Sequence, residues 1–375
     1  MRAGISEESR EAVLAIEAAV LPYNDGCGTV ADPAGIPLMG TIESGVKDMR
    51  AATPQEWRRF GRGASRFVGL LAVVWLVLSS FQRAFPYLAS GAALVAQDKF
   101  YILAGTKLFG PGDRFKVIAV GNSRTMAGVV PKIFDATAGE GVRIYNFGLP
   151  GDPRILPILE AVLDGGNRPD FVLLQAPWDT EQPAPTFWNT LPNDHQIADA
   201  VFPFRKLPRD LLFLLADSVH SNPAVVYRRN RAEADSVIRD EGWYFIRSQS
   251  HYPNDQLPSG YRLPTDHPDV AAARDLTPRG YEFERLKALA ATYKFKVILI
   301  PPALRTGEIA PPKPAAGLRA LPSAGGFYTL GPDYVNYPPS MFADPVHLNP
   351  PGAAVYSEYL AALFRDNIVA GGRAL

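Results

Sequence analysis

The sequence predicts an α/β fold in three α/β/α layers around a mainly parallel sheet, preceded by one apolar helix near the N-terminus. From about residue 115, short apolar runs rich in β-branched residues alternate with segments of helical periodicity. The runs are mainly apolar, as expected for strands that helices cover on both faces. An uncharged stretch from Phe67 to Gln82 precedes this region.

Composition narrows the classes of function. The chain has 375 residues, of which 47% are hydrophobic, and it carries 38 Lys and Arg against 38 Asp and Glu. Such a chain can bury one large core or two modest ones. The balanced charge argues against nucleic-acid binding, which usually requires a strongly basic domain or stripe. The single cysteine, Cys27, excludes an intrachain disulfide framework and a CxxC motif.

The apolar stretch Phe67 to Gln82 has the flanks of a membrane anchor. It follows four arginines, which are Arg58, Arg59, Arg62 and Arg66. A spanning helix needs about 20 apolar residues; this run is shorter, but flanking arginines can snorkel and apolar residues continue beyond Arg83. The alternative is a buried core helix. The arginines on one side favour an uncleaved single-pass anchor over residues 58–90.

The same arginines predict the topology. The positive-inside rule leaves the N-terminus in the cytoplasm and places residues 91–375 on the periplasmic side of the inner membrane. Residues 1–57 are weakly patterned and predict a largely disordered tail. Met49 begins a charged leader before the apolar stretch, which is the layout of an export signal or signal anchor. The true start is therefore Met1 or Met49, and residues 1–48 are either a tail or an upstream extension of the reading frame.

Strands and helices follow in alternation. The predicted strands are 116–120, 142–147, 170–176 and 296–302, and the predicted helices are 131–139, 153–166, 278–295 and 349–368. In parallel sheets, functional residues gather at the carboxyl ends of the strands. Ser123 lies just past the first strand. A helix N-cap would explain a serine there, and the Gly-x-Ser-x-Gly elbow is not met because Thr125 stands in place of its second glycine.

Two later segments favour a catalytic interpretation of Ser123. The segment "YNFGLPGD" ends the second strand with Gly148 and Gly151, and glycines allow backbone amides to approach a developing anion closely. In "ADPVHLNPPG", Asp344 precedes His347 by three residues. This spacing lets the carboxylate accept a hydrogen bond from the Nδ1–H group of the imidazole and leaves Nε2 for a serine hydroxyl. Together these are the parts of an acyl-transfer site.

These three segments resemble the sequence blocks of the SGNH, or GDSL-like, hydrolases. "VGNSRT" is similar to the first block, with Ser123 as nucleophile, and "NFGLPGD" to the second, with Gly151 as an oxyanion-hole donor. "DPVHLNPPG" resembles the last block, which supplies Asp344 and His347. The resemblance covers about residues 115–180 and 290–366. It implies a serine esterase or acyltransferase that works through an acyl-serine intermediate without a cofactor.

One block departs from the family pattern. The third block of the family usually ends in Gly-x-Asn-Asp, whose Asn completes the oxyanion hole, whereas this chain has Trp178 and Asp179 at that place. The hole would then rest on the backbone amides of Ser123 and Gly151, with the Trp178 indole N–H as a further donor. Loss of one such donor costs a hydrolase about a hundredfold or more in rate.

This departure and the anchor together resemble one branch of the family. Its anchored proteins work beside membrane-bound O-acyltransferases in acylating envelope polymers, as in alginate acetylation and teichoic-acid D-alanylation. The resemblance implies that the partners are a glycan polymer, an acyl donor and a membrane-bound O-acyltransferase. The alternative is a non-catalytic scaffold or glycan-binding partner that retains the fold.

A segment rich in proline and aromatic residues, about 179–275, predicts an insertion in the domain. Its aromatic side chains would line a glycan groove or form a small core of the insertion itself, and the second interpretation is favoured; they include Trp188, Trp243, Tyr244 and Tyr252. His195 and His251 are expected to be structural or surface residues. No cluster of His, Asp and Glu has the spacing of metal ligands, so no metal is predicted.

Overall fold

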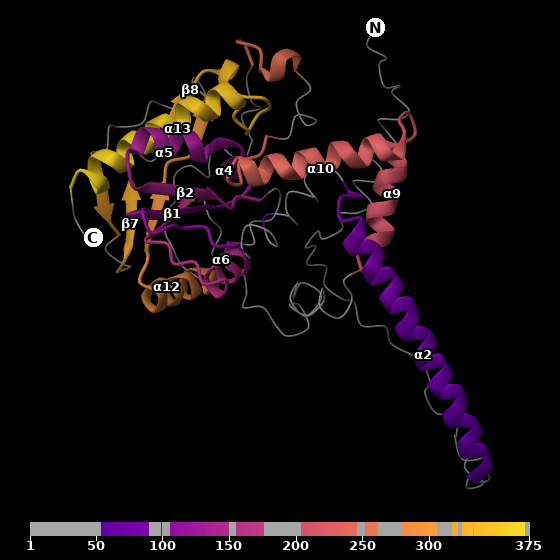
Figure 1. Ribbon diagram of the computed structural model, residues 1–375. Helices are drawn as coiled ribbons and strands as arrows, with labels where there is room; N and C mark the ends of the chain where they lie inside the picture. Colours follow the sequence, from indigo (N-terminus) through magenta and orange to yellow (C-terminus); the bar gives the residue numbers. More distant parts are fainter. Residues whose placement is uncertain are drawn as a thin grey trace, which may run out of the picture. The chain divides into compact units, whose positions relative to one another are not determined.

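The computed structural model describes residues 54–89, 99, 106–149, 155–175, 204–245, 252–261, 280–305, 317–321, 325–332 and 334–371. The chain divides into two units, Met1–Val68 and Gly69–Leu375. The second unit contains an α/β core (Figure 1). The predicted α/β class with a mainly parallel sheet is therefore confirmed.

The main sheet has six strands in the order β2-β1-β3-β4-β7-β6. All neighbouring strands are parallel except β6 and β7, which are antiparallel. The strands are β1 (Phe115–Val120), β2 (Val142–Asn146), β3 (Phe171–Gln175), β4 (Lys296–Ile300), β6 (Leu318–Ala320) and β7 (Phe327–Leu330). A second sheet pairs β5 (Ala303–Arg305) with β8 (Val335–Tyr337) in parallel.

The register aligns the carboxyl ends of the central strands. Ala119 of β1 pairs with Asn146, the last residue of β2, and Val120 pairs with Leu174 of β3. On the other side of β3, Gln175 pairs with Ile300, the last residue of β4. The chain therefore leaves these four strands along one edge of the sheet, which is where parallel sheets place their sites.

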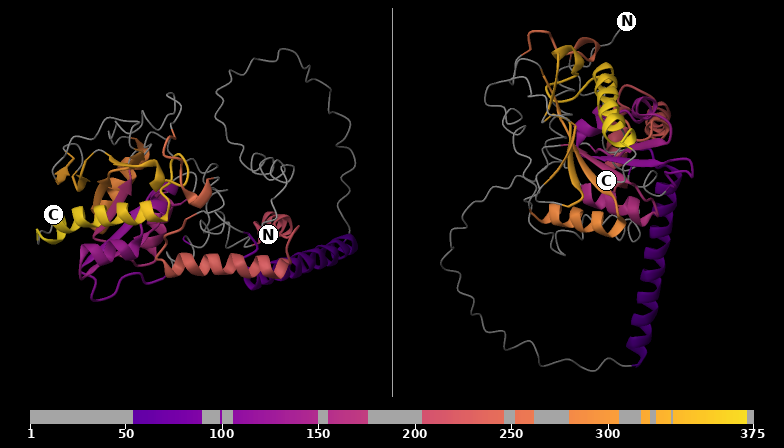
Figure 2. Two further views of the ribbon diagram at one scale, coloured as in Figure 1. Left: turned by 90° about the horizontal axis from the view of Figure 1, so that it is seen from above. Right: turned by 90° about the vertical axis from the view of Figure 1, so that its left-hand side faces the viewer.

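Helices cover both faces of the sheet because successive strand residues point to opposite sides. On one face, Ile118 and Val120 pack with α6 (Ile155–Asp164) and α12 (Tyr281–Tyr293). On the other face, Val117 and Ala119 pack with α5 (Pro131–Ala138) and α13 (Pro350–Phe364), as Figures 1 and 2 show.

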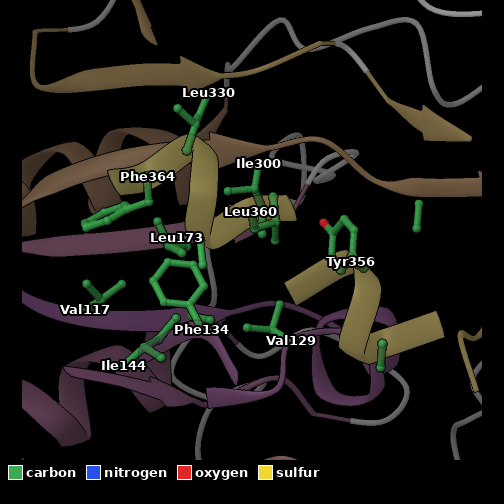
Figure 3. Close-up of a cluster of buried hydrophobic side chains, with 14 of the residues drawn as sticks. Val117, Val129, Phe134, Ile144, Leu173, Ile300, Leu330, Tyr356, Leu360 and Phe364 are labelled. Carbon is green, nitrogen blue, oxygen red and sulfur yellow. The ribbon is translucent and has the colours of Figure 1, made fainter. Parts of the chain in front are cut away.

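The α13 face has the larger aromatic contacts. Figure 3 shows Phe134 of α5 and Phe364 of α13 meeting over Val117 and Leu173. The centroids of the two phenylalanine rings lie 5.6 Å apart, and both side chains are fully buried. Burial of each such side chain contributes roughly 1.5–3 kcal/mol. This packing fixes α13, the helix that follows His347, against the sheet.

The described residues of the predicted insertion include two α-helices that the sequence did not reveal. They are α9 (Leu207–Asp217) and α10 (Pro223–Arg239). Beyond the end of α10, the Trp243 Nε1–H group donates a 2.8 Å hydrogen bond to the carbonyl oxygen of Ala127, and Tyr244 packs against Met126. Tyr252 packs on the α13-side core. The favoured interpretation of a separate core is thus wrong for Tyr252, which packs on the α/β core. Tyr244 packs against both Met126 of α4 (Ser123–Gly128) and Val237 of α10, in a small cluster between the insertion and the core. Trp188, His195 and His251 lie outside the described residues.

Helix α2 spans Pro54–Ala84, 31 residues. Its segment Trp57–Ala84 is long and apolar enough to cross a membrane. The most apolar 18-residue window of this segment has a mean hydropathy of 1.8, and only 6% of that window is buried. A soluble core helix, the alternative considered from sequence, would be mostly buried. A signal sequence would have the same length and composition, so the anchor and its orientation stay predictions. The predicted tail lies outside the described residues as far as residue 53.

Candidate active site

Ser123 is the first residue of a short helix, α4 (Ser123–Gly128), directly after β1. The N-cap of α4 is Asn122, whose Oδ1 accepts a 3.0 Å hydrogen bond from the Arg124 N–H group. The alternative that Ser123 itself caps the helix is therefore wrong. Asn122 performs that task and leaves the Ser123 hydroxyl for another partner.

That partner is His347, as the sequence predicts. His347 Nε2 lies 2.7 Å from Ser123 Oγ, and His347 Nδ1 lies 2.7 Å from Asp344 Oδ2. The second Asp344 oxygen accepts hydrogen bonds of 2.8 Å from the backbone N–H groups of Val346 and His347. The three predicted side chains thus form one hydrogen-bonded chain in the order Ser, His, Asp.

Electrostatics keep Asp344 ionised. Burial by itself raises the pKa of this carboxyl, but hydrogen bonds from the His347 ring and from the backbone of Val346 and His347 outweigh burial and lower the pKa overall. An ionised Asp344 accepts a hydrogen bond from the Nδ1–H group and holds the imidazole in the tautomer whose Nε2 is unprotonated. In that tautomer Nε2 accepts the Ser123 hydroxyl proton.

The loop that carries Asp344 and His347 is closed by its own backbone. Ala343 N–H donates to the carbonyl oxygen of His347, and Phe342 and Leu348 form an antiparallel bridge. Asn349 then caps α13 by accepting a hydrogen bond from Gly352 N–H. A side chain at Gly352 would put its Cβ 2.2 Å from the Met341 carbonyl oxygen, so the helix can begin this close to the loop only with glycine there.

The end of β2 contacts α4 through Asn146 and Gly148. A Cβ atom at Gly148 would lie 2.4 Å from the backbone nitrogen of Met126, so this close approach also requires glycine. Gly148 N–H donates to Asn146 Oδ1 at 2.8 Å. The expectation that glycines here present amides to a developing anion is therefore wrong for Gly148, whose N–H group is already used. Gly151 and Trp178, the other predicted donors, lie outside the described residues.

Lys99 is a residue near this turn that sequence analysis missed. Its side chain is fully buried and its Nζ group donates to the carbonyl oxygen of Gly148. Burial lowers the pKa of Lys99 well below its usual value. A lysine that directly follows Gln97 and Asp98 gives no signal in a sequence pattern, and only the fold brings it to the β2 end.

The geometry has a defined chemical capacity. A serine hydroxyl bonded to an imidazole, which a carboxylate holds in turn, can lose its proton as the oxygen attacks a carbonyl carbon. Within the described ranges, no group of three or more His, Cys, Asp or Glu residues is placed to hold a metal ion.

Comparison of the chain with protein-family models, with curated proteins and with solved structures gives no match.

Proposed function

We propose that the chain is an extracytoplasmic serine acyl esterase or O-acyltransferase with an SGNH-type three-layer fold, acting on a cell-envelope polysaccharide. The observation that carries the proposal is the hydrogen-bonded chain of Ser123, His347 and Asp344 at the carboxyl edge of a parallel sheet. The helices that cover both faces of the sheet support the three-layer arrangement.

In the proposed reaction, His347 Nε2 takes the Ser123 proton while Oγ attacks the ester carbonyl carbon. The tetrahedral intermediate collapses, the leaving alcohol takes the proton from Nε2, and an acyl-serine remains. Water or a sugar hydroxyl then gives its proton to Nε2 and attacks the acyl carbon. Ser123 Oγ leaves with that proton, which restores the enzyme. The backbone amides of Ser123 and Gly151, with the Trp178 indole, are the proposed oxyanion donors.

The third sequence block, in which Trp178 stands where the family has Asn, favours a sugar hydroxyl over water as the acyl acceptor. Without the family's Asn, attack on any ester is slow, and water is a poor acceptor in a slow site. A sugar hydroxyl held in place regains part of this loss, because oriented delivery gives high effective concentrations. Helix α2, as an anchor, would keep Ser123 near a membrane-embedded acyl donor and a membrane-bound O-acyltransferase.

The same missing Asn favours a second candidate, a non-catalytic scaffold or glycan-binding partner. The two functions differ in whether Ser123 is activated. A fluorophosphonate reacts covalently with an activated serine and needs no knowledge of the natural substrate.

The test exposes the full chain in detergent to the fluorophosphonate and compares the parent with Ser123→Ala and His347→Ala. Ser357→Ala is the matched control, because Ser357 is buried and bonds only to backbone groups in the contacts that the structure describes. We expect labelling of the parent and of Ser357→Ala, and loss of labelling in the other two. A folded parent that does not label would favour the scaffold.

A further inference from the structure

We propose that helix α9 lies in the surface of the lipid bilayer, beside the point where α2 leaves it, with its exposed apolar face toward the acyl chains of anionic lipids. The inference rests on the proposed function, because it takes α2 as the membrane anchor. It adds a second membrane contact, which the proposed catalytic domain makes itself.

The outward face of α9 is apolar. Its residues recur with the period of a helix and are all exposed; they are Pro208, Leu212, Leu215, Ala216 and, just past the end of the helix, Val219. Leu212 and Leu215 are 66% and 61% exposed. The buried residues of α9, Leu207 and Asp210, lie on the opposite side. A surface helix normally turns its apolar side inward, so an apolar outward face marks an interaction surface.

Helix α10 connects α9 to the end of α2. It packs against α9, and Arg229 Nη2 of α10 lies 3.4 Å from Asp217 Oδ2, at the end of α9. The next residue, Asn230, is fully buried, and its Nδ2 group donates to the carbonyl oxygens of Tyr87 and Leu88 at 3.2 and 3.4 Å. These carbonyls lie just past the end of α2. The pair of helices α9 and α10 is therefore held where α2 would leave the bilayer.

Aromatic rings indicate the same level in the membrane. The segment that could span a membrane ends at Ala84, and Phe85 and Tyr87 follow it. The ring centroid of Tyr227, in α10, lies 6.0 Å from that of Phe85 and 6.1 Å from that of Tyr87. Tyrosine is enriched at the interface between membrane and water, where its ring is buried and its hydroxyl is hydrated. We therefore expect the first half of α10, and α9 beside it, at the level of the lipid headgroups.

The charge of this region suits anionic headgroups. Residues 204–231 contain six Lys and Arg against two Asp and Glu, although the whole chain has 38 of each. Both acidic side chains lie against arginines, Asp210 on Arg209 at 2.6 Å and Asp217 on Arg229. Basic residues beside an exposed apolar face are typical of helices that lie in a membrane surface and bind anionic lipids.

The other end of α10 contacts the helix that carries Ser123. Val237 packs with Met126 of α4, and Trp243, beyond the end of α10, donates to the carbonyl oxygen of Ala127. Helix α10 has 17 residues and is thus about 25 Å long. One helix joins the lipid-contacting surface to α4. Docking of α9 would hold Ser123 at a set height above the bilayer, which suits an acyl donor that arrives from the membrane.

The test places an NBD fluorophore at single positions of the full chain in vesicles. Cys27→Ala removes the one natural cysteine, and three separate variants then add one: Leu215→Cys in α9, Val77→Cys in α2 and Val355→Cys in α13. Val355 is the matched control, because it is an aliphatic residue, 39% exposed, on a helix of the α/β core. The vesicles contain equal parts of phosphatidylcholine and phosphatidylglycerol, with or without nitroxides on the acyl chains, which quench NBD at that depth.

We expect the nitroxide lipids to remove most of the fluorescence of the Leu215→Cys and Val77→Cys labels and little of the Val355→Cys label. Adding Leu212→Glu to Leu215→Cys should restore most of the fluorescence, because a carboxylate is costly among acyl chains. The same addition to Val77→Cys should change nothing. Circular dichroism of each protein controls for folding.

Quenching at Val77→Cys without quenching at Leu215→Cys would overturn the inference and leave the anchor standing. Blue-shifted but unquenched emission from Leu215→Cys would also overturn it, since a second copy of the chain would then cover α9. Equal quenching at Val355→Cys would do the same, as a sign of unspecific adsorption. An unquenched Val77→Cys label would instead overturn the proposed anchor, and the inference with it. Fluorophosphonate labelling of the same proteins tests the proposed role of Ser123 separately.

Discussion

The Nδ2 group of Asn146 lies 2.6 Å from the carbonyl oxygen of Val129, and it also donates to the carbonyl oxygens of Thr125 and Met126. The last residue of β2 thereby supplies a donor to the carbonyls at the end of α4, where the Thr125 carbonyl oxygen also accepts from the Val129 N–H group. Its Oδ1 accepts from Gly148. One fully buried amide thus joins the Ser123 helix to the β2 turn.

Asn146→Asp should destabilise the chain by about 3 kcal/mol or more. The substitution places a carboxylate oxygen against three carbonyl oxygens in a buried site and removes their donor. Urea unfolding followed by circular dichroism measures the free energy of unfolding. Asn222→Asp is the control, because Asn222 caps α10 as an acceptor at the surface, a task that aspartate retains. Equal, small effects of the two substitutions would contradict this role of Asn146.

The contribution of Asp135 to the stability of the chain should fall as the pH rises from about 4 to about 7. Burial raises the pKa of Asp135 to about 7 and, with repulsion from Glu241 and Asp113, outweighs the Ile144 N–H group and Arg143. The folded chain then binds a proton that the unfolded chain has released, so the contribution of Asp135 is greatest below pH 4 and is lost as the pH rises through 7. A shift of about three units corresponds to at most about 4 kcal/mol.

The measurement is the free energy of unfolding of the parent minus that of Asp135→Asn at several pH values. Asn retains an acceptor for Ile144 N–H, the hydrogen bond that Asp135 Oδ1 makes at 2.9 Å. The difference should decrease between pH 4 and 7 and be constant above pH 8. A difference that is flat across this range would mean that Asp135 is ionised in the folded chain.

The sequence was sufficient for the larger strands, their helices and the three hydrogen-bonded side chains. Apolar runs identified β1, β3 and β4, because strands covered on both faces are apolar along most of their length. Strand β2 lies at the edge of the sheet and alternates buried with half-buried residues. Asp344 and His347 were found because their spacing is local and their chemistry is specific. Their contact with Ser123, 224 residues away from His347, was expected from the resemblance of the three sequence blocks, because the loop with His347 follows β8 of the second sheet and not a strand of the main sheet.

The elements that the sequence missed owe their structure to distant partners. Strand β6 has three residues, all at least partly exposed, and exists because it pairs with β7. Helix α10 buries Val226, Asn230, Ala234 and Val237, and a face with one polar and one small residue gives a weak apolar period. The buried hydrogen bond from Thr125 Oγ1 to Gln175 Oε1 joins α4 to β3, and two residues 50 positions apart give no pattern in the sequence.

Asp344→Asn should lower the rate of fluorophosphonate labelling by about a thousandfold or more while the fold persists. The Asn Oδ1 would still accept from the Val346 and His347 backbone, but its Nδ2 would present a donor to His347 Nδ1 and favour the tautomer with a protonated Nε2. The control is Asp366→Asn, an exposed carboxylate paired with Arg365. Parent-like labelling of Asp344→Asn would show that His347 does not need this carboxylate.

The topology predicted from the arginine cluster can be checked in intact cells. A reporter that is active only after export should be active when fused after Gly110 and inactive when fused after Arg66, before the apolar run. Western blotting of both fusions controls for expression. An inactive but well-expressed fusion after Gly110 would contradict the proposed orientation of α2.

The most direct test of the account is the mass of the intact full chain during reaction with a small activated acetyl ester. If His347 activates Ser123, a fraction of the parent should gain the mass of one acetyl group, and peptide mapping should locate it on Ser123. The adduct should decay faster when a glycan oligomer is added, with acetylated sugar as the product. Absence of any Ser123-dependent adduct, in a folded parent and with parent and Ser123→Ala indistinguishable, would contradict the central claim that Ser123 is an activated nucleophile.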